Sequence, residues 1–329
     1  MDVSCAFPTT LESPAHIQTA EELGYARAWL YDTPQNSPDV WMTLALAAAR
    51  TTRIGLGPAV LVPTLRHPMV NAAATAMLVH LAPGRVTVAF GTGFSGRRAM
   101  GYGAIPWSFV RDYVAAYRGL LRGDVVEWEG AWMQMLHPTG SAPPRPISVP
   151  LLLAAGGPKG LAAAADLADG IFVVGAVPEP ASTFPVVCFL ASGTVLGHGE
   201  EVTSPRVRAA AGPGTAQKFH GAYVSGGRAA VAGLPGGEAW LEVVDRAPPI
   251  QRHLAVHRGH AVEMNEADQA AWEAGGATMT GEATFTGTAD RVRQRLDALA
   301  QAGVTEFVYQ PAGPDIEAEL EHFLAAAQA

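Results

Sequence analysis

The sequence has little cysteine, no long apolar run and no excess of basic residues. Only two of its 329 residues are cysteines, Cys5 and Cys188. Both lie in apolar, strand-like runs, which indicates buried thiols in a reducing compartment rather than a disulfide or a catalytic pair. No apolar run reaches the ~18 residues of a membrane span. The first residues lack the basic region and apolar core of a signal peptide. We therefore expect a cytoplasmic protein with no membrane partner.

The net charge and the apolar content indicate which classes of protein fit this sequence. The formal net charge is −8, which argues against nucleic-acid binding because that function needs a basic face. Apolar residues make up 49% of the chain and charged residues 16%, as expected for a compact protein with a large core. An anionic ligand would have to be held by local backbone groups and a few cations.

Strand-like and helix-like segments alternate along most of the chain. Eight apolar segments have the length of buried strands, and helical patterns lie between most of them. This alternation predicts a (β/α)8 TIM barrel that spans residues 1–329 as a single domain, with a doubly wound open sheet as the alternative. The strand-like segments are Val3–Phe7, Ala28–Asp32, Arg53–Val62, Arg85–Gly91, Leu151–Ala154, Ile171–Val174, Pro185–Leu196 and Thr305–Gln310.

Two segments interrupt this alternation. Val125–Met135 is typical of a hairpin that turns at Glu129-Gly130. A longer insertion, residues 197–285, separates the seventh strand from the eighth. Because it follows the carboxyl end of a barrel strand, we expect it to cover the mouth of the barrel as a lid. Within it, the pattern predicts turns at Gly212-Pro213-Gly214 and Leu234-Pro235-Gly236-Gly237, and helical pieces around Glu238–Asp245 and Pro249–Trp272.

The fifth strand is followed by a motif typical of a phosphate site. After Leu151–Ala154 come Ala155, a glycine turn at Gly156-Gly157, and then Pro158 and Lys159 at the start of an alanine-rich helix. A glycine turn at a helix N-terminus leaves free backbone N–H groups at the positive end of the helix. The motif therefore predicts a seat for a phosphate or another anionic cofactor group.

Polar or glycine-rich motifs also follow the second, third and fourth strands. As an ordered set, the motifs resemble the bacterial luciferase-like superfamily of flavin- and deazaflavin-dependent oxidoreductases, whose fold is a (β/α)8 barrel. The turn Gly157-Pro158-Lys159 is most similar to that of the methylenetetrahydromethanopterin reductase branch, which uses coenzyme F420. The motifs that carry the resemblance are Asp32, Ile54–Gly57, Arg66-His67-Pro68, Gly84-Arg85, Gly91-Thr92-Gly93, Gly119–Gly123, Trp128-Glu129-Gly130, Ala155–Lys159, Ala168-Asp169-Gly170, Gly287–Asp290 and Ala302–Val304.

The resemblance implies hydride transfer between F420 and a small organic substrate at the barrel mouth. It implies a non-prolyl cis peptide bond at Ala59–Val60, although the family usually has glycine at the position of Ala59. The alternative is a luciferase-like monooxygenase that uses reduced FMN and O2. The cofactor-binding residues implied are Asp32, Ala59, Val60, Thr92, Ala155, Gly156, Gly157, Pro158 and Lys159.

The proton donor is not at its expected place, because the branch often has histidine where this chain has Thr33. The insertion offers His253, His257 and His260, which share one face if the segment is a single helix. Three interpretations stay open: a solvated polar face, a metal site, or a substrate-facing role. No H-E-x-x-H motif accompanies the histidines, so we expect no metal and take Asp32 and His257 as candidate catalytic residues.

Other classes of function are also compatible with the sequence. One is a non-catalytic barrel that only binds a ligand, and another is an isomerase-like barrel that acts on a phosphorylated substrate. Family resemblance suggests a homodimer, and the apolar helices Asp39–Arg50 and Pro68–Leu81 are candidates for its interface. Trp41 and Trp107 are candidates for an apolar substrate pocket, with ordinary packing as the simpler interpretation.

Overall fold

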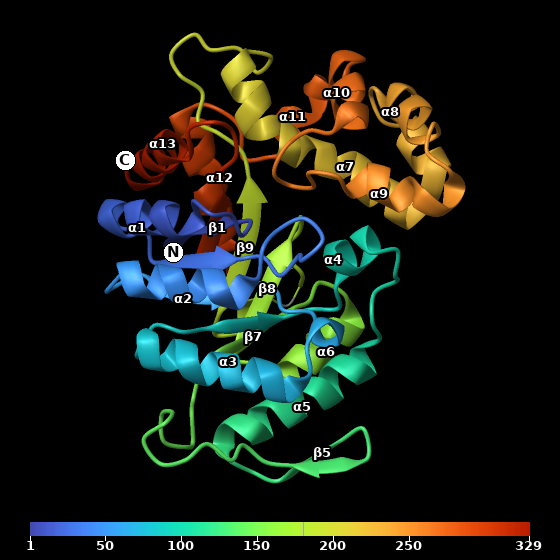
Figure 1. The fold of residues 1–329 in the computed structure, drawn as a ribbon. Helices are drawn as coiled ribbons and strands as arrows, with labels where there is room; N and C mark the ends of the chain where they lie inside the picture. The colour runs from blue at the N-terminus through green and yellow to red at the C-terminus, as the bar shows by residue number, and fades with distance from the viewer. Residues whose placement is uncertain (180) are drawn as a thin grey trace.

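An eight-stranded parallel sheet forms the centre of the molecule and curls almost into a closed barrel (Figure 1). The structure, a computed structural model, describes residues 1–179 and 181–329. The strand order is β3-β2-β1-β10-β9-β8-β7-β4. The two end strands approach each other through the bridges Leu56–Val86 and Leu61–Phe90, which nearly close the sheet. The predicted (β/α)8 barrel is confirmed, and the open sheet is excluded.

The barrel strands are β1 (Asp2–Phe7), β2 (Arg27–Leu30), β3 (Gly55–Pro58), β4 (Val88–Phe90), β7 (Leu151–Ala154), β8 (Gly170–Val174), β9 (Val187–Ser192) and β10 (Glu306–Gln310). The helices of the first part are α1 (Ser13–Leu23), α2 (Val40–Arg50), α3 (Pro68–Leu81), α4 (Phe94–Ala99), α5 (Trp107–Arg122) and α6 (Pro158–Leu167), with short 3-10 turns at Pro63–Leu65 and Ala181–Thr183. The later helices are α7 (Pro205–Ala232), α8 (Gly237–Val244), α9 (Arg252–His257), α10 (Glu266–Glu273), α11 (Thr280–Ala283), α12 (Ala289–Gln301) and α13 (Ile316–Gln328), with 3-10 turns at Pro249–Gln251 and Gly276–Met279.

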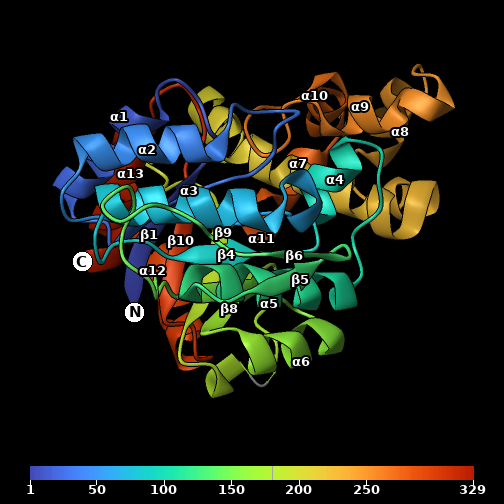
Figure 2. The same ribbon diagram turned by 60° about the horizontal axis from the view of Figure 1, so that its bottom comes forward.

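Two apolar layers hold the barrel together. The inner layer fills the barrel with side chains from its strands, among them Trp29, whose indole Nε1 donates to the Glu306 carboxylate at 2.8 Å. The outer layer lies between the strands and the surrounding helices. Figure 2 shows α1, α2 and α3 side by side in this helical shell. Asp39 helps to start α2, because its carboxylate accepts hydrogen bonds from the Trp41 and Met42 N–H groups.

The hairpin and both buried cysteines agree with the sequence. Strands β5 (Val126–Trp128) and β6 (Ala131–Met133) pair antiparallel around Glu129 and Gly130, which both have positive φ as a tight hairpin turn requires. Cys5 and Cys188 are free and buried. Among the described residues, no helix is both long and apolar enough to cross a bilayer.

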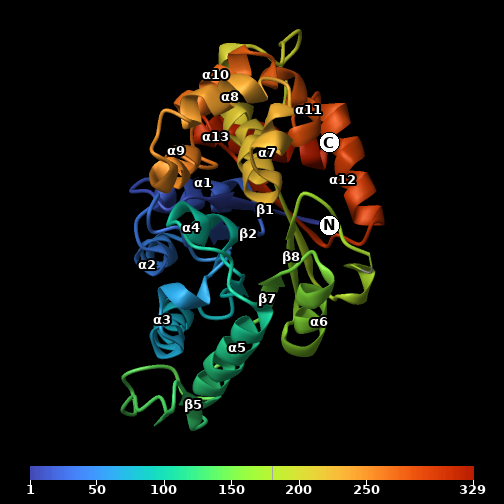
Figure 3. The ribbon, with the colours of Figure 1, turned by 90° about the vertical axis from the view of Figure 1, so that its right-hand side faces the viewer.

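The insertion lies between β9 and β10, the seventh and eighth barrel strands, as predicted. Its helices α7 to α11 gather at one end of the molecule, and the β5 hairpin lies at the other (Figure 3). The insertion leaves and rejoins the barrel at adjacent positions: Val195 forms a parallel bridge with Gly287, and the Leu196 N–H donates to the Gly287 carbonyl at 2.9 Å.

The predicted turn at Gly212-Pro213-Gly214 is wrong, because α7 runs through it. The two glycines serve close packing instead of a turn. A Cβ on Gly214 would lie 2.0 Å from the Ser192 Oγ, and one on Gly212 would lie 2.7 Å from the Met264 Sδ. The lost Pro213 N–H costs one helical hydrogen bond, which the buried packing of this stretch outweighs.

The single helical piece expected around Pro249–Trp272 is also wrong. Helix α9 ends at His257, and α10 starts only after Asn265. Asn265 and Asp268 form a reciprocal capping box that fixes the start of α10. Gly259 and Ala261 both have positive φ in the intervening turn. His260 lies in that turn, so His253, His257 and His260 do not share one helix face.

Candidate functional site

One large cavity lies where the carboxyl ends of the barrel strands, among them β2, β3, β4, β7, β8 and β9, meet the insertion. Its volume is about 680 Å³, within the range of sites that enclose a cofactor or a drug-sized ligand. The barrel contributes the loops after its strands, and α7, the turn after α9 and α11 contribute the facing wall. The insertion therefore forms part of the cavity wall at the carboxyl-terminal face of the barrel, where the active sites of such barrels lie.

Asp32 is fixed in the cavity wall by a shared cation. Its carboxylate is buried and accepts from the Arg66 Nη1 at 2.7 and 2.8 Å. Arg66 Nη2 donates to Asp39 at 2.6 Å, so one guanidinium joins the loops after β2 and β3 to the start of α2. Burial raises the pKa of Asp32 above its ordinary value, and Arg66 opposes that rise. Asp32 can thus accept a hydrogen bond from a ligand without leaving an unpaired buried charge.

The structure brings most of the predicted cofactor residues to this cavity. The Ala59–Val60 peptide bond is cis, which confirms that expectation. Ala59, Val60 and Thr92 line the cavity together with Asp32. Ala155 and Gly156 line it at the loop after β7.

Gly157, Pro158 and Lys159 lie beyond this lining, at the exposed start of α6. Within residues 1–179 and 181–329, the N–H groups of Gly156 and Gly157 donate no backbone hydrogen bond. A Cβ added to Gly156 would meet no atom within 4 Å. The turn is therefore free to donate to an anionic group, as the sequence predicted for a phosphate seat.

Three histidines meet on the insertion side of the cavity, but they are not the three that the sequence grouped. His257 at the end of α9 and His260 in the following turn approach His220, which lies on α7. Their ring centroids are 5.0 to 5.9 Å apart. His220 Nδ1 lies 2.7 Å from His260 Nδ1. We refer to His220, His257 and His260 as the three-histidine cluster.

Aspartate and tryptophan side chains support the cluster from behind. His220 Nε2 lies 3.0 Å from the Asp268 Oδ1, which also accepts from the Trp240 indole N–H at 2.9 Å. Burial, with the neighbouring histidines and Arg98, lowers the pKa of His257 to about 4, and burial lowers that of His260 well below its ordinary value. Both rings are therefore neutral at pH 7 and act there as hydrogen-bonding groups or ligands, not as cations.

Hydrogen bonds from three side-chain amides hold the turn that carries His260. The Asn265 amide donates to the carbonyls of Ala255, Val256 and Arg258, each at 3.3 Å. The Gln310 amide, from the end of β10, donates to the Ala261 carbonyl. The Asn36 amide, from the loop after β2, donates to the His257 carbonyl at 3.2 Å. The barrel and the insertion are thus joined by hydrogen bonds at the cluster.

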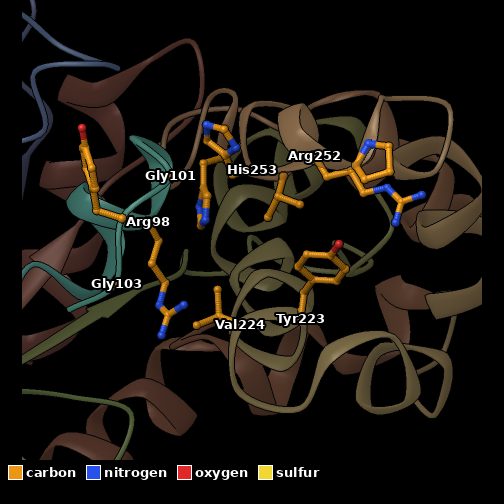
Figure 4. Close-up of a pocket in the computed structure, with 11 residues that line it drawn as sticks. Arg98, Gly101, Gly103, Tyr223, Val224, Arg252 and His253 are labelled. Carbon is orange, nitrogen blue, oxygen red and sulfur yellow. The ribbon is translucent and has the colours of Figure 1, made fainter.

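His253 is not part of the cluster and lines a second, smaller cavity of about 330 Å³ between α4 and the insertion (Figure 4). Gly101 lies next to it, and a Cβ there would approach the His253 Nε2 to 3.2 Å. Arg98, Tyr223 and Arg252 line the same space. His257 lines both cavities, so it lies at the boundary between them.

Sequence reasoning missed two residues of the site. Arg66 was recognised only as part of a motif. Its pairing with Asp32 was missed because the two residues are 34 positions apart in the chain. His220 lies on α7, and that helix was missed because a turn was predicted at Gly212-Pro213-Gly214. Trp41 and Trp107 do not line the large cavity: Trp41 donates to Asn71 in the core, and Trp107 packs against Gly160.

Comparison with known proteins gives one family match. The model of the family described as luciferase-like monooxygenase matches residues 11–186. This range includes β2 to β7 and every predicted cofactor residue, but not the insertion.

Two relatives and one solved structure illustrate what the chain is similar to. The chain is 35% identical over 172 residues to the F420-dependent glucose-6-phosphate dehydrogenase of Beutenbergia cavernae, covering 47% of this chain and only half of that relative's length. It is 26% identical over 313 residues to the 5,10-methylenetetrahydromethanopterin reductase of Archaeoglobus fulgidus, covering 91% of this chain and 90% of the relative. The coenzyme F420-dependent tetrahydromethanopterin reductase of Methanopyrus kandleri shares the fold, with a TM-score of 0.63 and 21% identity over 98% of this chain and 97% of that one.

Proposed function

Because this chain belongs to the luciferase-like monooxygenase family, we propose that it is an oxidoreductase that transfers hydride between coenzyme F420, a deazaflavin, and a small organic substrate. The observation that carries the proposal is the cavity of about 680 Å³, which extends from the free glycine turn after β7 to the three-histidine cluster of the insertion. Its extent leaves room for a cofactor ring and a small substrate side by side. Relatives whose names include F420 or methylenetetrahydromethanopterin reductase support this choice of cofactor.

The residues around the cavity fit such a cofactor. Gly156 and Gly157 offer unpaired N–H groups at the N-terminus of α6, and Pro158 and Lys159 follow in its first turn, a suitable place for the cofactor's phosphate. Ala59, Val60, Thr92 and Ala155 would contact the rest of the cofactor. When bound, F420 supplies a two-electron hydride carrier, while the protein holds and orients it.

Two side chains would act on the reacting groups. Asp32 would accept a hydrogen bond from the cofactor or the substrate, held in place by Arg66. His257 lies on the opposite wall, and its neutral imidazole would bind the oxygen of a carbonyl or alcohol. The insertion would keep bulk water from the space between them. The substrate we propose is therefore a small alcohol or carbonyl compound.

A cofactor titration tests the proposal. The purified full-length chain is titrated separately with F420 and with FMN, and binding is followed by quenching of the cofactor's fluorescence. We expect F420 to bind at least tenfold more tightly than FMN, and reduced F420 to appear when suitable alcohols are added. Tight FMN binding without measurable F420 binding would overturn the proposal.

The second candidate is an FMN-dependent monooxygenase that uses reduced flavin and O2. The family description favours it, and the phosphate seat before α6 would serve FMN equally well. The same titration separates the two functions. Consumption of O2 in the presence of reduced FMN, with an oxygenated product, would support this second function.

A further inference from the structure

We propose that the three-histidine cluster is a binding site for one divalent transition-metal ion of the zinc type, open toward the large cavity. Each of His220, His257 and His260 offers one ring nitrogen, and these nitrogens lie within 4.8 Å of one another. The three residues come from α7, from the end of α9 and from the following turn. The fold has therefore brought together ligands that are as much as 40 positions apart.

The donor set selects the class of ion. Imidazole nitrogens suit Zn²⁺, Cu²⁺, Ni²⁺ and Fe²⁺, whereas Mg²⁺ and Ca²⁺ prefer oxygen ligands. A tetrahedral zinc ion with Zn–N bonds of about 2.0–2.1 Å holds its ligand nitrogens about 3.3 Å apart. The Nδ1 atoms of His220 and His260 are 2.7 Å apart. They would separate by about 0.6 Å around an ion of this size, a small movement of two side chains.

An unsatisfied nitrogen in the cluster points to a missing partner. The Nδ1 of His257 is buried and has no hydrogen-bond partner among the described residues. His257 as a whole is only 5% exposed. A buried polar atom without a partner has lost its hydrogen bonds to water and gained none in return, so proteins rarely leave one. A metal ion at the centre of the cluster would give this ring a ligand bond.

A carboxylate behind the cluster fixes the orientation of one ligand. Asp268 lies 3.0 Å from the Nε2 of His220, which leaves the Nδ1 of that ring facing His260. Asp268 is itself held by the Trp240 indole and by the Asn265 backbone N–H at 3.1 Å. Metal-bound histidines typically have such a carboxylate on the second nitrogen, which fixes the ring and raises its basicity.

The surroundings also hold the ligands in place before any ion binds. Asn265, Gln310 and Asn36 fix the backbone on both sides of His257 and His260. Sites with such prior support lose little conformational entropy on binding.

All three histidines line the large cavity, so a fourth position on the ion would face it. Three protein ligands and an open position are the arrangement of catalytic zinc sites. If the proposed function holds, that position would take the oxygen of the alcohol or carbonyl substrate, and the ion would replace the direct contact between His257 and that oxygen. Metal binding itself does not depend on that function, because none of the predicted cofactor residues belongs to the cluster.

A spectroscopic titration with Co²⁺ tests the site without any cofactor. The full-length chain is stripped with a chelator and titrated with CoCl2, and then Zn²⁺ is added to displace the cobalt. We expect one equivalent to bind with the intense visible absorption of tetrahedral Co²⁺ and to be displaced by Zn²⁺. No saturable absorption change at a protein concentration high enough to detect one bound Co²⁺ per chain would overturn the proposal and leave a purely hydrogen-bonded cluster.

Variants assign the ligands. His220→Ala, His257→Ala and His260→Ala should each weaken Zn²⁺ binding at least a hundredfold. His253→Ala, a nearby histidine outside the cluster, should bind as the parent does. Equal binding by the parent and the three cluster variants, or a loss only in His253→Ala, would overturn the assignment.

A substituted ligand keeps the test decisive if an alanine variant does not fold. His260→Cys retains a ligand atom at this position. It should add a sulfur-to-cobalt charge-transfer band in the near ultraviolet. Absence of that band in the Co²⁺-bound variant would contradict ligation by His260. Asp268→Asn should weaken Zn²⁺ binding about 10- to 100-fold. F420 affinity, measured separately on the metal-free chain, distinguishes failure of this site from failure of the proposed function.

Discussion

Asp32 and Asp39 share one cation, the guanidinium of Arg66. Asp32 is buried, so its charge depends on this partner more than that of Asp39, which is partly exposed. The sequence identified Asp32 and the Arg66-His67-Pro68 motif, but not their contact, because the pairing follows from the position of two loops around a closed barrel. His220 illustrates the same limit: its two partners in the cluster, His257 and His260, are 37 and 40 positions away in the chain.

At this scale we predict that Arg66→Met destabilises the fold. Removal of the guanidinium leaves the Asp32 carboxylate buried without a partner, which should lower the free energy of unfolding by about 3 kcal/mol. Urea denaturation measures the change. Arg111→Met breaks an exposed pair with Asp166 and should change the free energy by less than about 1 kcal/mol. Equal effects from the two substitutions would refute a special role for Arg66.

Gly156 permits a second test of a single residue. A Cβ there meets no atom within 4 Å, so Gly156→Ala should fold normally, yet its methyl group would enter the proposed cofactor space. We predict about tenfold weaker F420 binding, equivalent to about 1.4 kcal/mol, in a fluorescence titration. Gly281→Ala is the matched control, since its Cβ is equally free and the residue does not line the cavity. Unchanged affinity in Gly156→Ala would place the cofactor elsewhere.

Among the elements, the start of α7 is anchored by charge. Arg206 donates to Glu200 in the preceding loop and to Glu319 on α13, each with a contact of 2.5 Å. Glu200 also accepts from the Gly197 N–H and from Ser204. The hydrogen bond from Arg206, with these donors, lowers the pKa of Glu200 to about 2. This anchor joins the insertion to the outer helices of the barrel.

The low pKa of Glu200 predicts a pH dependence of stability. Because the carboxylate is favoured in the folded state, its contribution is fully present above its unfolded pKa of about 4.3 and is lost as the pH falls toward 2. Glu200→Gln should therefore lower the free energy of unfolding by about 1–2 kcal/mol at pH 7, a value reduced by solvent screening of the partly exposed Arg206. The difference from the parent should shrink between about pH 4.3 and 2.

Denaturation at a series of pH values measures this difference. Glu127→Gln, in the exposed β5 hairpin, provides the control and should differ little from the parent at any pH. A Glu200→Gln effect that stays constant down to pH 3 would contradict the assignment.

Prediction of the elements succeeded where periodicity and capping agreed, and failed in the insertion. The eight barrel strands were found because parallel strands buried on both faces are continuous apolar runs. Two of them were predicted too long: β3 stops at Pro58 instead of Val62, and β9 stops at Ser192 instead of Leu196. In α7, Gly212 and Gly214 look like turn residues, although they are there for close contact with Met264 and Ser192. Such contacts exist only in the folded molecule.

On the scale of the whole molecule, α2 and α3 present an apolar surface to solvent. Met42 and Leu46 on α2 are 72% and 60% exposed, and Val70 and Met77 on α3 are 52% and 56% exposed. The two helices pack side by side (Figure 2), so these exposed apolar residues lie on neighbouring helices. Exposed apolar side chains grouped in this way are typical of protein–protein interfaces.

We predict a homodimer through this face. Light scattering coupled to size-exclusion chromatography should give about twice the mass of the chain, and the combined substitution of Met42→Glu with Met77→Glu should give the mass of one chain. Ile250→Glu changes an equally exposed apolar residue in the insertion and should leave the dimer intact. A parent protein that elutes as a monomer at tens of micromolar would refute this interface.

The sequence predicted most of the barrel side of the cavity. It did not predict the complete cavity. The ends of β2, β3, β4 and β7 carry recognisable motifs, and a barrel brings them to one mouth by topology alone. The opposite wall comes from α7, α11 and the turn after α9, whose side chains meet only through the packing of the insertion. Under the proposed function, that wall would contact the substrate.

The two ends of the insertion are paired with each other beside the barrel, at Val195 and Gly287. A segment whose ends already touch can be replaced by another of different length without moving any strand of the barrel. Under the proposed function, the side of the cavity that would contact the substrate comes mostly from this one continuous segment, whereas the proposed cofactor residues lie in the barrel loops. A laboratory graft that exchanges the segment between residues 196 and 286 would therefore leave every barrel strand unchanged in sequence.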